Sequence, residues 1–217
     1  MDIEVRCAAL LFDCDGVVVD STDSGEQAWR QWATEYGLDP EQVLVGIHGR
    51  RSADTVRLFL PEEAHAEGLA RIETIEIAGA VGTSPIPGAL ELLNRLADNW
   101  AIVTSASPAL LTARLTAAGL PLPPVTITAA DVTAGKPAPD GYLLAAHKLS
   151  TPITDCVVLE DSTTGIAAGL AAAPHRVIGV GAHALTTDAP VVIRDLTGAS
   201  PTPTGIHFPA TSVLRPS

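Results

Sequence analysis

The sequence contains little of what nucleic-acid-binding and membrane-spanning proteins need. Lys and Arg make up only 13 of the 217 residues, whereas Asp and Glu make up 25, and the formal net charge is −12. Because phosphate backbones are bound through clustered Lys and Arg, we predict no nucleic-acid partner. No uninterrupted apolar run reaches the length of about 18 residues that crosses a bilayer, so we also predict no membrane span.

Cysteine is scarce, and the first residues do not resemble a secretion signal. The three cysteines, Cys7, Cys14 and Cys156, lack the paired spacing of a zinc site or a disulfide framework, so we expect them to be reduced. Residues 1–5 have neither the basic start nor the apolar centre of a signal peptide. These features favour a cytoplasmic protein. They leave the oligomeric state open, with a monomer slightly favoured.

Lysine is the scarcest charged residue, and Lys136 and Lys148 are its only occurrences. A chain this acidic repels polyanions. It can still bind a small phosphorylated metabolite if a metal ion and a few local cations reverse the field at the site.

Apolar, β-branched runs recur along the chain and are separated by helical-looking stretches. The runs lie at 8–12, 101–103, 125–127, 156–159 and 177–180. This alternation predicts an α/β fold with a doubly wound parallel sheet that carries helices on both faces. In such sheets ligands bind outside the carboxyl ends of the strands. Asp13, Ser105 and Asp161 each follow a predicted strand, so we expect these distant residues to meet at one edge.

The first and second predicted strands are separated by roughly 85 residues, far more than a simple crossover needs. An amphipathic helix is predicted at 24–36, and further helices are predicted around 52–60 and 62–78. A segment of this length must hold its own structure. We therefore predict a helical cap, residues 22–84, inserted into a core domain.

The core domain is predicted to comprise residues 1–21 and 85–196. The remaining tail, residues 197–217, is rich in Pro, Thr, Ser and Gly and shows no sustained hydrophobic period. We expect this tail to be a surface arm or partly disordered.

Two carboxylates one residue apart, Asp13 and Asp15, end the first apolar run. Like charges this close repel each other, so both stay ionised only with help from a cation. Oxygen ligands suit a hard divalent ion, and Mg²⁺ is favoured where phosphate also binds. The simpler alternative is an acidic turn after a strand.

The pattern of Asp13, Asp15, Gly16, Asp20 and Ser21 matches DxDGxxxDS. It resembles the first motif of the haloacid-dehalogenase superfamily of phosphotransferases, and the resemblance covers about residues 5–183. It implies a Rossmann-like core with an inserted α-helical cap. It also implies that Asp13 is a nucleophile that becomes an aspartyl phosphate, and that Asp15 protonates the leaving group and then activates water.

Two further segments resemble the superfamily's second and third motifs. In residues 102–107 a strand ends in Thr104 and Ser105. The resemblance implies that Ser105, with Thr104 as the reserve, and the backbone amide of Ala106 hold phosphate oxygens. Lys136, followed by proline, matches the third motif and would pair with Asp13 and the incoming phosphate. Alone, each signal is weak, because helix caps and surface lysines produce similar patterns.

The pair Glu160 and Asp161 resembles the fourth motif. The resemblance implies that Asp161 is a direct Mg²⁺ ligand together with the Asp13 carboxylate and the Asp15 backbone carbonyl. Glu160 would bind the ion directly or through water. The same acids could also cap a helix at its positive end, which is compatible with the metal role.

Residues 48–51 form a predicted cap loop with the sequence His-Gly-Arg-Arg. It is similar to the His-Gly-x-Arg loop of helical-cap glycerol-3-phosphate and 2-deoxyglucose-6-phosphate phosphatases. That similarity implies that His48 and Arg51 contact the substrate, and it favours small sugar or polyol phosphates. Adjacent arginines at an exposed helix start are otherwise ordinary solubility charges.

These observations leave three hypotheses. The preferred one is a Mg²⁺-dependent phosphatase that works through phospho-Asp13. A phosphomutase of the β-phosphoglucomutase kind would share every core motif. Those enzymes use a cap lysine that this cap lacks, although a cap arginine could substitute for it: Arg50, Arg51, Arg57 or Arg71. A domain that only accepts phosphate on Asp, like a receiver domain, fits less well, because such domains have no cap-sized insert.

Overall fold

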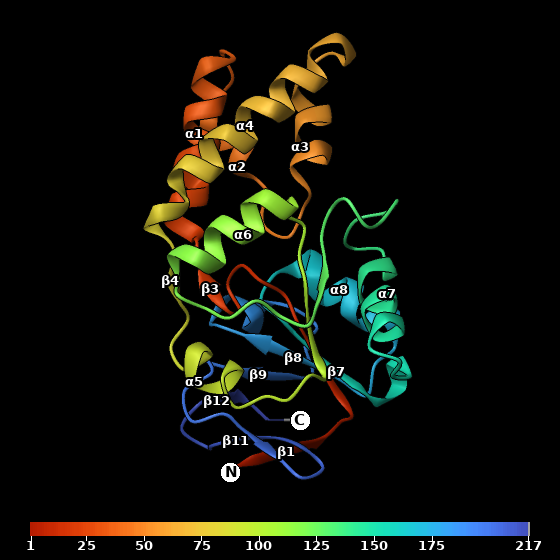
Figure 1. Ribbon diagram of the computed structural model, residues 1–217. Helices are drawn as coiled ribbons and strands as arrows, with labels where there is room; N and C mark the ends of the chain where they lie inside the picture. The colour runs from red at the N-terminus through yellow and green to blue at the C-terminus, as the bar shows by residue number, and fades with distance from the viewer. Residues whose placement is uncertain (217) are drawn as a thin grey trace.

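The computed structural model describes residues 1–216, and a seven-stranded sheet forms its centre (Figure 1). The order is β12-β9-β8-β7-β2-β5-β6, parallel except for β12. The strands are β2 (Ala9–Phe12), β5 (Trp100–Val103), β6 (Val125–Ile127), β7 (Cys156–Glu160), β8 (Arg176–Val180), β9 (Val191–Ile193) and β12 (Val213–Arg215). The expected parallel α/β fold is confirmed, and each of the five expected strands lies within one residue of its observed bounds.

Two apolar layers sandwich this sheet because its inner strands are buried along their whole length. Successive side chains of a strand point to opposite faces, so Leu11 joins one layer while Leu10 and Phe12 join the other. Helices α7 (Asp140–Lys148) and α8 (Thr163–Ala172) cover the first face. Helices α5 (Ala89–Leu93) and α6 (Pro108–Ala117) cover the second.

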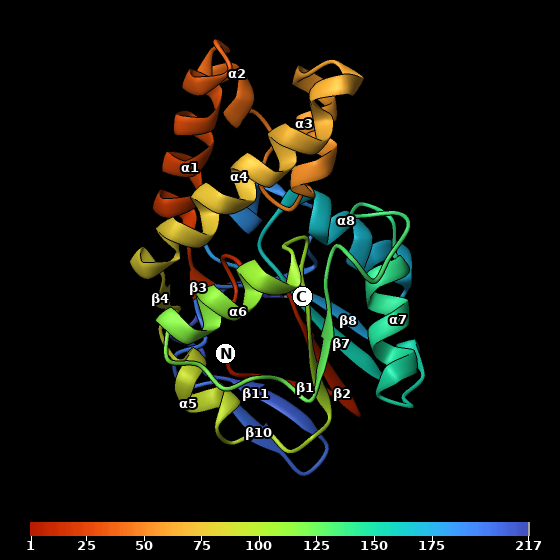
Figure 2. The ribbon, with the colours of Figure 1, turned by 45° about the horizontal axis from the view of Figure 1, so that its top comes forward.

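The cap is a helical cluster between β2 and β5, placed beyond one edge of the sheet in both ribbon views (Figure 2). Its helices are α1 (Thr22–Glu35), α2 (Pro40–Leu44), α3 (Ser52–Phe59), η1 (Glu62–Ala64), α4 (His65–Gly79) and η2 (Ala80–Gly82). They pack around their own apolar cluster, in which the indole nitrogen of buried Trp32 donates to the Gly68 carbonyl at 2.9 Å. The short strands β3 (Val19–Asp20) and β4 (Ser84–Pro85) pair where the chain leaves and re-enters the core.

No helix in the described part of the chain has both the length and the apolar character needed to cross a membrane.

The C-terminal stretch corrects one expectation. Within the described residues 197–216 it is neither a loose arm nor disordered; the remaining residue of the expected tail, 217, lies outside the described part. Strands β10 (Ser200–Thr202) and β11 (Gly205–Phe208) form a three-stranded antiparallel sheet with β1 (Ile3–Arg6), and β12 completes the edge of the main sheet. The prediction was wrong because most residues of the tail are polar, Pro or Gly, and its short strand β11 buries only two apolar side chains, those of Ile206 and Phe208. Two such residues give no sustained hydrophobic pattern.

We predict that Phe208→Ala destabilises the whole protein. The Phe208 ring is fully buried in the core layer that also holds β2 and β5 residues, and emptying such a site costs about 3–5 kcal/mol. Chemical denaturation would measure the loss. Leu122→Ala is the control, since Leu122 is 69% exposed and its truncation should change stability by less than about 0.5 kcal/mol. A similarly small effect of Phe208→Ala would show that the C-terminal strands add little to the core.

Candidate active site

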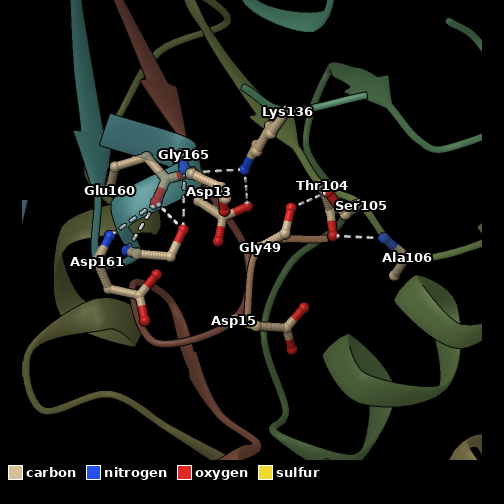
Figure 3. Close-up of polar contacts among 12 residues, drawn as sticks. Asp13, Asp15, Gly49, Thr104, Ser105, Ala106, Lys136, Glu160, Asp161 and Gly165 are labelled. Carbon is tan, nitrogen blue, oxygen red and sulfur yellow. Dashed lines mark hydrogen bonds and ion pairs between the residues drawn. The ribbon is translucent and has the colours of Figure 1, made fainter. Parts of the chain in front are cut away.

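The residues expected at the site converge on the carboxyl edge of the sheet. Pairing in register places the last residue of β2, Phe12, beside Leu159 of β7 and Ile102 of β5. The residues that follow these positions therefore meet at one level: Asp13 after β2, Thr104 and Ser105 after β5, and Glu160 and Asp161 on β7 and just beyond it. Figure 3 shows Lys136, from the loop before α7, reaching into the same group.

Lys136 joins the two most buried carboxylates of this group. Its Nζ donates to Oδ1 of Asp13 and to Oε1 of Glu160, each at 2.6 Å, and its side chain is only 6% exposed. Burial lowers the pKa of the Lys136 ammonium, but the charges of Asp13 and Glu160 outweigh burial and raise it well above its usual range. Burial raises the pKa of Asp13 to about 7, and the Lys136 charge limits that rise.

Both carboxylate oxygens of Glu160 accept several hydrogen bonds. Besides Lys136, its Oε1 accepts from the Tyr142 hydroxyl at 3.0 Å. Its Oε2 accepts from the backbone amides of Asp161 and Ser162 at 2.9 and 3.1 Å, and from the Ser162 hydroxyl at 3.2 Å. Glu160 thus orders the start of α8 and holds Lys136, and its hydrogen bonds favour an indirect relation to a metal ion over a direct one.

The acidic cluster fits a divalent cation. Asp13, Glu160 and Asp161 can each offer an oxygen within 4.8 Å of the others, and Lys136 is the only ammonium bonded to them. Burial, followed by the charges of Glu160 and Asp13, raises the pKa of Asp161 well above its usual range. Within residues 1–216 no hydrogen-bond donor reaches the Asp161 carboxylate. Clustered oxygen ligands with uncompensated negative charge are the donor set that Mg²⁺ prefers.

A glycine is required beside Asp161. Gly16 has φ of +78°, in the left-handed region that favours glycine, and a Cβ at this position would lie 2.0 Å from Oδ2 of Asp161. The chain after Asp15 can therefore pass close to Asp161 only without a side chain.

Asp15 points away from the Asp13 carboxylate (Figure 3). Its Oδ1 accepts from the Ser21 hydroxyl at 2.6 Å and its Oδ2 accepts from Nη1 of Arg114 at 3.0 Å. Arg114, on α6, is 7% exposed, and its Nη2 donates to Oε1 of Glu76 on the cap helix α4 at 3.2 Å. Reasoning from sequence missed Arg114 and Glu76; the one signal was a charged residue among the apolar positions of each helix.

The expected phosphate-binding residues lie beside Asp13 but already have partners. The Ser105 hydroxyl donates to the Gly49 carbonyl of the cap loop at 2.7 Å. The Ala106 amide donates to the Thr104 hydroxyl at 3.0 Å. Ser105 thus faces the cap loop, and Thr104 orders the backbone that follows β5.

The two cap-loop residues expected at the site have different positions. His48 lines the same pocket as Asp13, and its Nε2 lies 3.7 Å from Oε1 of Glu26. Arg51 lies outside this pocket but lines a larger cavity between the cap and the core. Its guanidinium pairs with Asp54 at 2.7 Å and donates to the carbonyls of Val132 and Thr133 on the core, at 3.3 and 3.0 Å. Its neighbour Arg50, rather than Arg51, lines the pocket above Asp13.

Two cavities meet between the cap and the core. The smaller, about 90 Å³, contains Asp13, Asp15, Ser105 and Asp161. The larger, about 330 Å³, lies between α3 and α4 of the cap and the core segment around Pro108. A group held at Asp13 could therefore extend into a second space that the cap encloses.

Comparison with known proteins agrees with this geometry. A family model described as haloacid dehalogenase-like hydrolase matches residues 7–173. Hexitol phosphatase A of Escherichia coli (strain K12) is 45% identical over 188 residues, which cover 84% of this chain and 87% of the relative. The 2-deoxyglucose-6-phosphate phosphatase 1 of Saccharomyces cerevisiae (strain ATCC 204508 / S288c) is 35% identical, covering 74% of this chain and 75% of the relative. The crystal structure of β-phosphoglucomutase from Clostridium difficile superposes with a TM-score of 0.77 at 20% identity, covering 88% of this chain and 92% of that one, and shows a shared fold.

We predict that Asp13 makes the metal-free protein less stable as the pH rises. A pKa raised from 3.8 to about 7 means that the native state favours neutral Asp13, so its stabilising contribution is complete below about pH 4 and is lost through pH 7. In EDTA, the unfolding free energy of the wild type minus that of Asp13→Asn should fall between pH 5 and pH 8, by at most about 3 kcal/mol. A difference that does not vary with pH would contradict the raised pKa.

Proposed function

The chain belongs to the haloacid dehalogenase-like hydrolase family, and from that premise we propose that it is a Mg²⁺-dependent phosphatase of small sugar or polyol phosphates. The resemblance recognised in its four motifs is confirmed by the family model and by relatives that are named phosphatases. One observation carries the proposal: Lys136 bridges Asp13 and Glu160 at 2.6 Å each, beneath a cap and beside Asp161.

Asp13 is suited to act as the nucleophile. Lys136 occupies its Oδ1, and within residues 1–216 no donor is bonded to Oδ2, which is therefore the oxygen that would attack phosphorus. As the new Oδ2–P bond forms, the ester P–O bond breaks and its electron pair leaves with the alcohol oxygen. That oxygen takes a proton from Asp15, and the product is phospho-Asp13.

Hydrolysis of phospho-Asp13 reverses the role of Asp15. The Asp15 carboxylate takes a proton from water while the water oxygen attacks phosphorus. The Oδ2–P bond breaks, its electron pair returns to Asp13, and inorganic phosphate is released. Asp15 regains the proton it gave up, so the cycle closes with water consumed and alcohol formed.

Binding of the phosphoryl group needs positive charge and donors. Lys136 supplies the ammonium, and Ser105 and the Ala106 amide are the proposed donors, with the Ser105 hydroxyl turning from the Gly49 carbonyl to the phosphate. Asp13, Asp161 and the Asp15 backbone carbonyl would hold Mg²⁺, with Glu160 acting through its neighbours. When bound, the ion neutralises charge on the phosphate oxygens.

The proposed substrate class follows from the relatives and from the polar lining of the cap. Hexitol phosphatase A and 2-deoxyglucose-6-phosphate phosphatase 1 are named for phosphorylated polyhydroxy compounds. His48 and Arg50 of the cap line the pocket above Asp13, where they could meet substrate hydroxyls. Arg51, held by the core loop, lines the larger cavity, so it would meet the part of the substrate that extends there and not the phosphate end.

We predict that Asp13→Asn abolishes turnover without unfolding the protein. An amide is not a nucleophile toward phosphorus, so phosphate release from a hexitol 6-phosphate should fall by at least about 10³-fold. Asp98→Asn makes the same chemical change at an exposed position and should leave the rate unaltered. Substantial activity in folded Asp13→Asn would exclude the covalent mechanism.

We predict that EDTA abolishes phosphate release and that added Mg²⁺ restores it, because the buried carboxylates repel a phosphate dianion without a cation.

Product analysis with a hexose 1-phosphate separates the phosphatase from a mutase. Release of inorganic phosphate supports hydrolysis, whereas conversion to the 6-phosphate without release would establish the mutase instead.

A further inference from the structure

A buried ion pair crosses from the cap to the core beside the proposed site. Glu76 on α4 is 8% exposed and Arg114 on α6 is 7% exposed. Arg114 donates from Nη2 to Oε1 of Glu76 at 3.2 Å, and the Ser52 hydroxyl, at the start of α3, donates to Oε2 at 3.2 Å. Each oxygen of the Glu76 carboxylate therefore has one donor.

Holding the cap to the core does not by itself explain the buried ion pair between Glu76 and Arg114. Burying a charged pair removes water from both groups, and a well-packed apolar pair of similar volume often holds two elements at least as firmly. Arg114 also has a second partner, because its Nη1 donates to Asp15 at 3.0 Å. One guanidinium thus serves two carboxylates and holds both at the pocket that they line.

Glu76 lies where the two cavities meet. Both cavities are lined by Glu76, Ser52, Ser105 and Leu110, whereas Asp13 and Asp15 line only the smaller one. An alcohol group that leaves from phosphate at Asp13 would extend past Glu76 into the larger cavity. Glu76 is therefore placed where the alcohol part of the substrate would pass from one cavity to the other.

The Glu76 carboxylate retains acceptor capacity at this junction. An ionised carboxylate has about four lone-pair sites, and Arg114 and Ser52 occupy one on each oxygen. Hydroxyl groups are the natural donors for the remaining sites, since bonds to a charged acceptor are strong. Because both outer nitrogens of the planar Arg114 guanidinium are engaged, its rigid fork sets the spacing between Asp15 and Glu76.

We propose that Glu76, oriented by Arg114 and Ser52, binds a hydroxyl of the alcohol part of the substrate and so makes the enzyme select polyhydroxylated alkyl phosphates. This inference rests on the proposed phosphatase function and assigns the selectivity to a side chain outside the four motifs. Glu76 is the specificity-determining residue, and Arg114 and Ser52 are positioning residues.

The test compares three substrates in wild type and Glu76→Gln: a hexitol 6-phosphate, an unsubstituted alkyl phosphate and p-nitrophenyl phosphate. Glutamine keeps the shape but removes the charge that strengthens a bond from a hydroxyl. We expect kcat/KM for the hexitol phosphate to fall by roughly 10- to 100-fold, and the values for the other two substrates to change by less than about threefold. Glu67→Gln is the matched control, because Glu67 is exposed on the same helix.

Each result has a definite reading. Equal losses on all three substrates, or no loss on any, would overturn the inference and leave the phosphatase proposal intact. A wild type that releases no phosphate from any substrate would overturn the proposed function itself. If Glu76→Gln does not fold, Ser52→Ala decides: a severalfold loss confined to the hexitol phosphate supports the inference, and an unselective effect contradicts it.

Discussion

The site depends on one lysine held between two buried carboxylates. Asp13 is 4% exposed and Glu160 is fully buried, and each bonds to the same Nζ. Removing one partner of a buried pair leaves an uncompensated charge, which is far more damaging than the pair is stabilising. Glu160 in turn accepts from the amides of Asp161 and Ser162, the two residues before α8, so the lysine, the end of β7 and the start of that helix are linked by hydrogen bonds.

Hydrogen bonds also hold the cap loop against the core, and such bonds can be exchanged for bonds to a substrate. The cap loop meets the core through bonds from Ser105 to the Gly49 carbonyl and from Thr164 to the His48 carbonyl. Gly49 permits this approach, because a Cβ there would lie 2.4 Å from the hydroxyl oxygens of Ser162 and Thr164. An interface of hydrogen bonds can exchange partners with a substrate or water, whereas an apolar interface would have to expose its surface to open.

Sequence patterns predicted the parts of the site whose signals are local. Asp13 and Asp161 follow apolar strands that pair in one sheet, so their meeting follows from topology alone. Arg114 and Glu76 could not be predicted, because they lie 38 residues apart on different domains and neither belongs to a motif. The C-terminal strands were missed for a related reason: β11 pairs with β1, nearly the whole chain away, while the tail around β11 is rich in Pro, Thr, Ser and Gly and has a composition typical of a loop.

The balance of charge explains how an acidic chain can select a small anionic substrate. Asp13, Glu160 and Asp161 share one ammonium, and Asp15 and Glu76 share one guanidinium, so both clusters remain negative when ionised. Under the proposed function, a phosphate group would enter the first cluster together with a cation, because Lys136 is already divided between two carboxylates. Glu76 of the second cluster would then accept from hydroxyl groups of the same molecule. The two proposals together imply a substrate with phosphate at one end and uncharged hydroxyls along the rest.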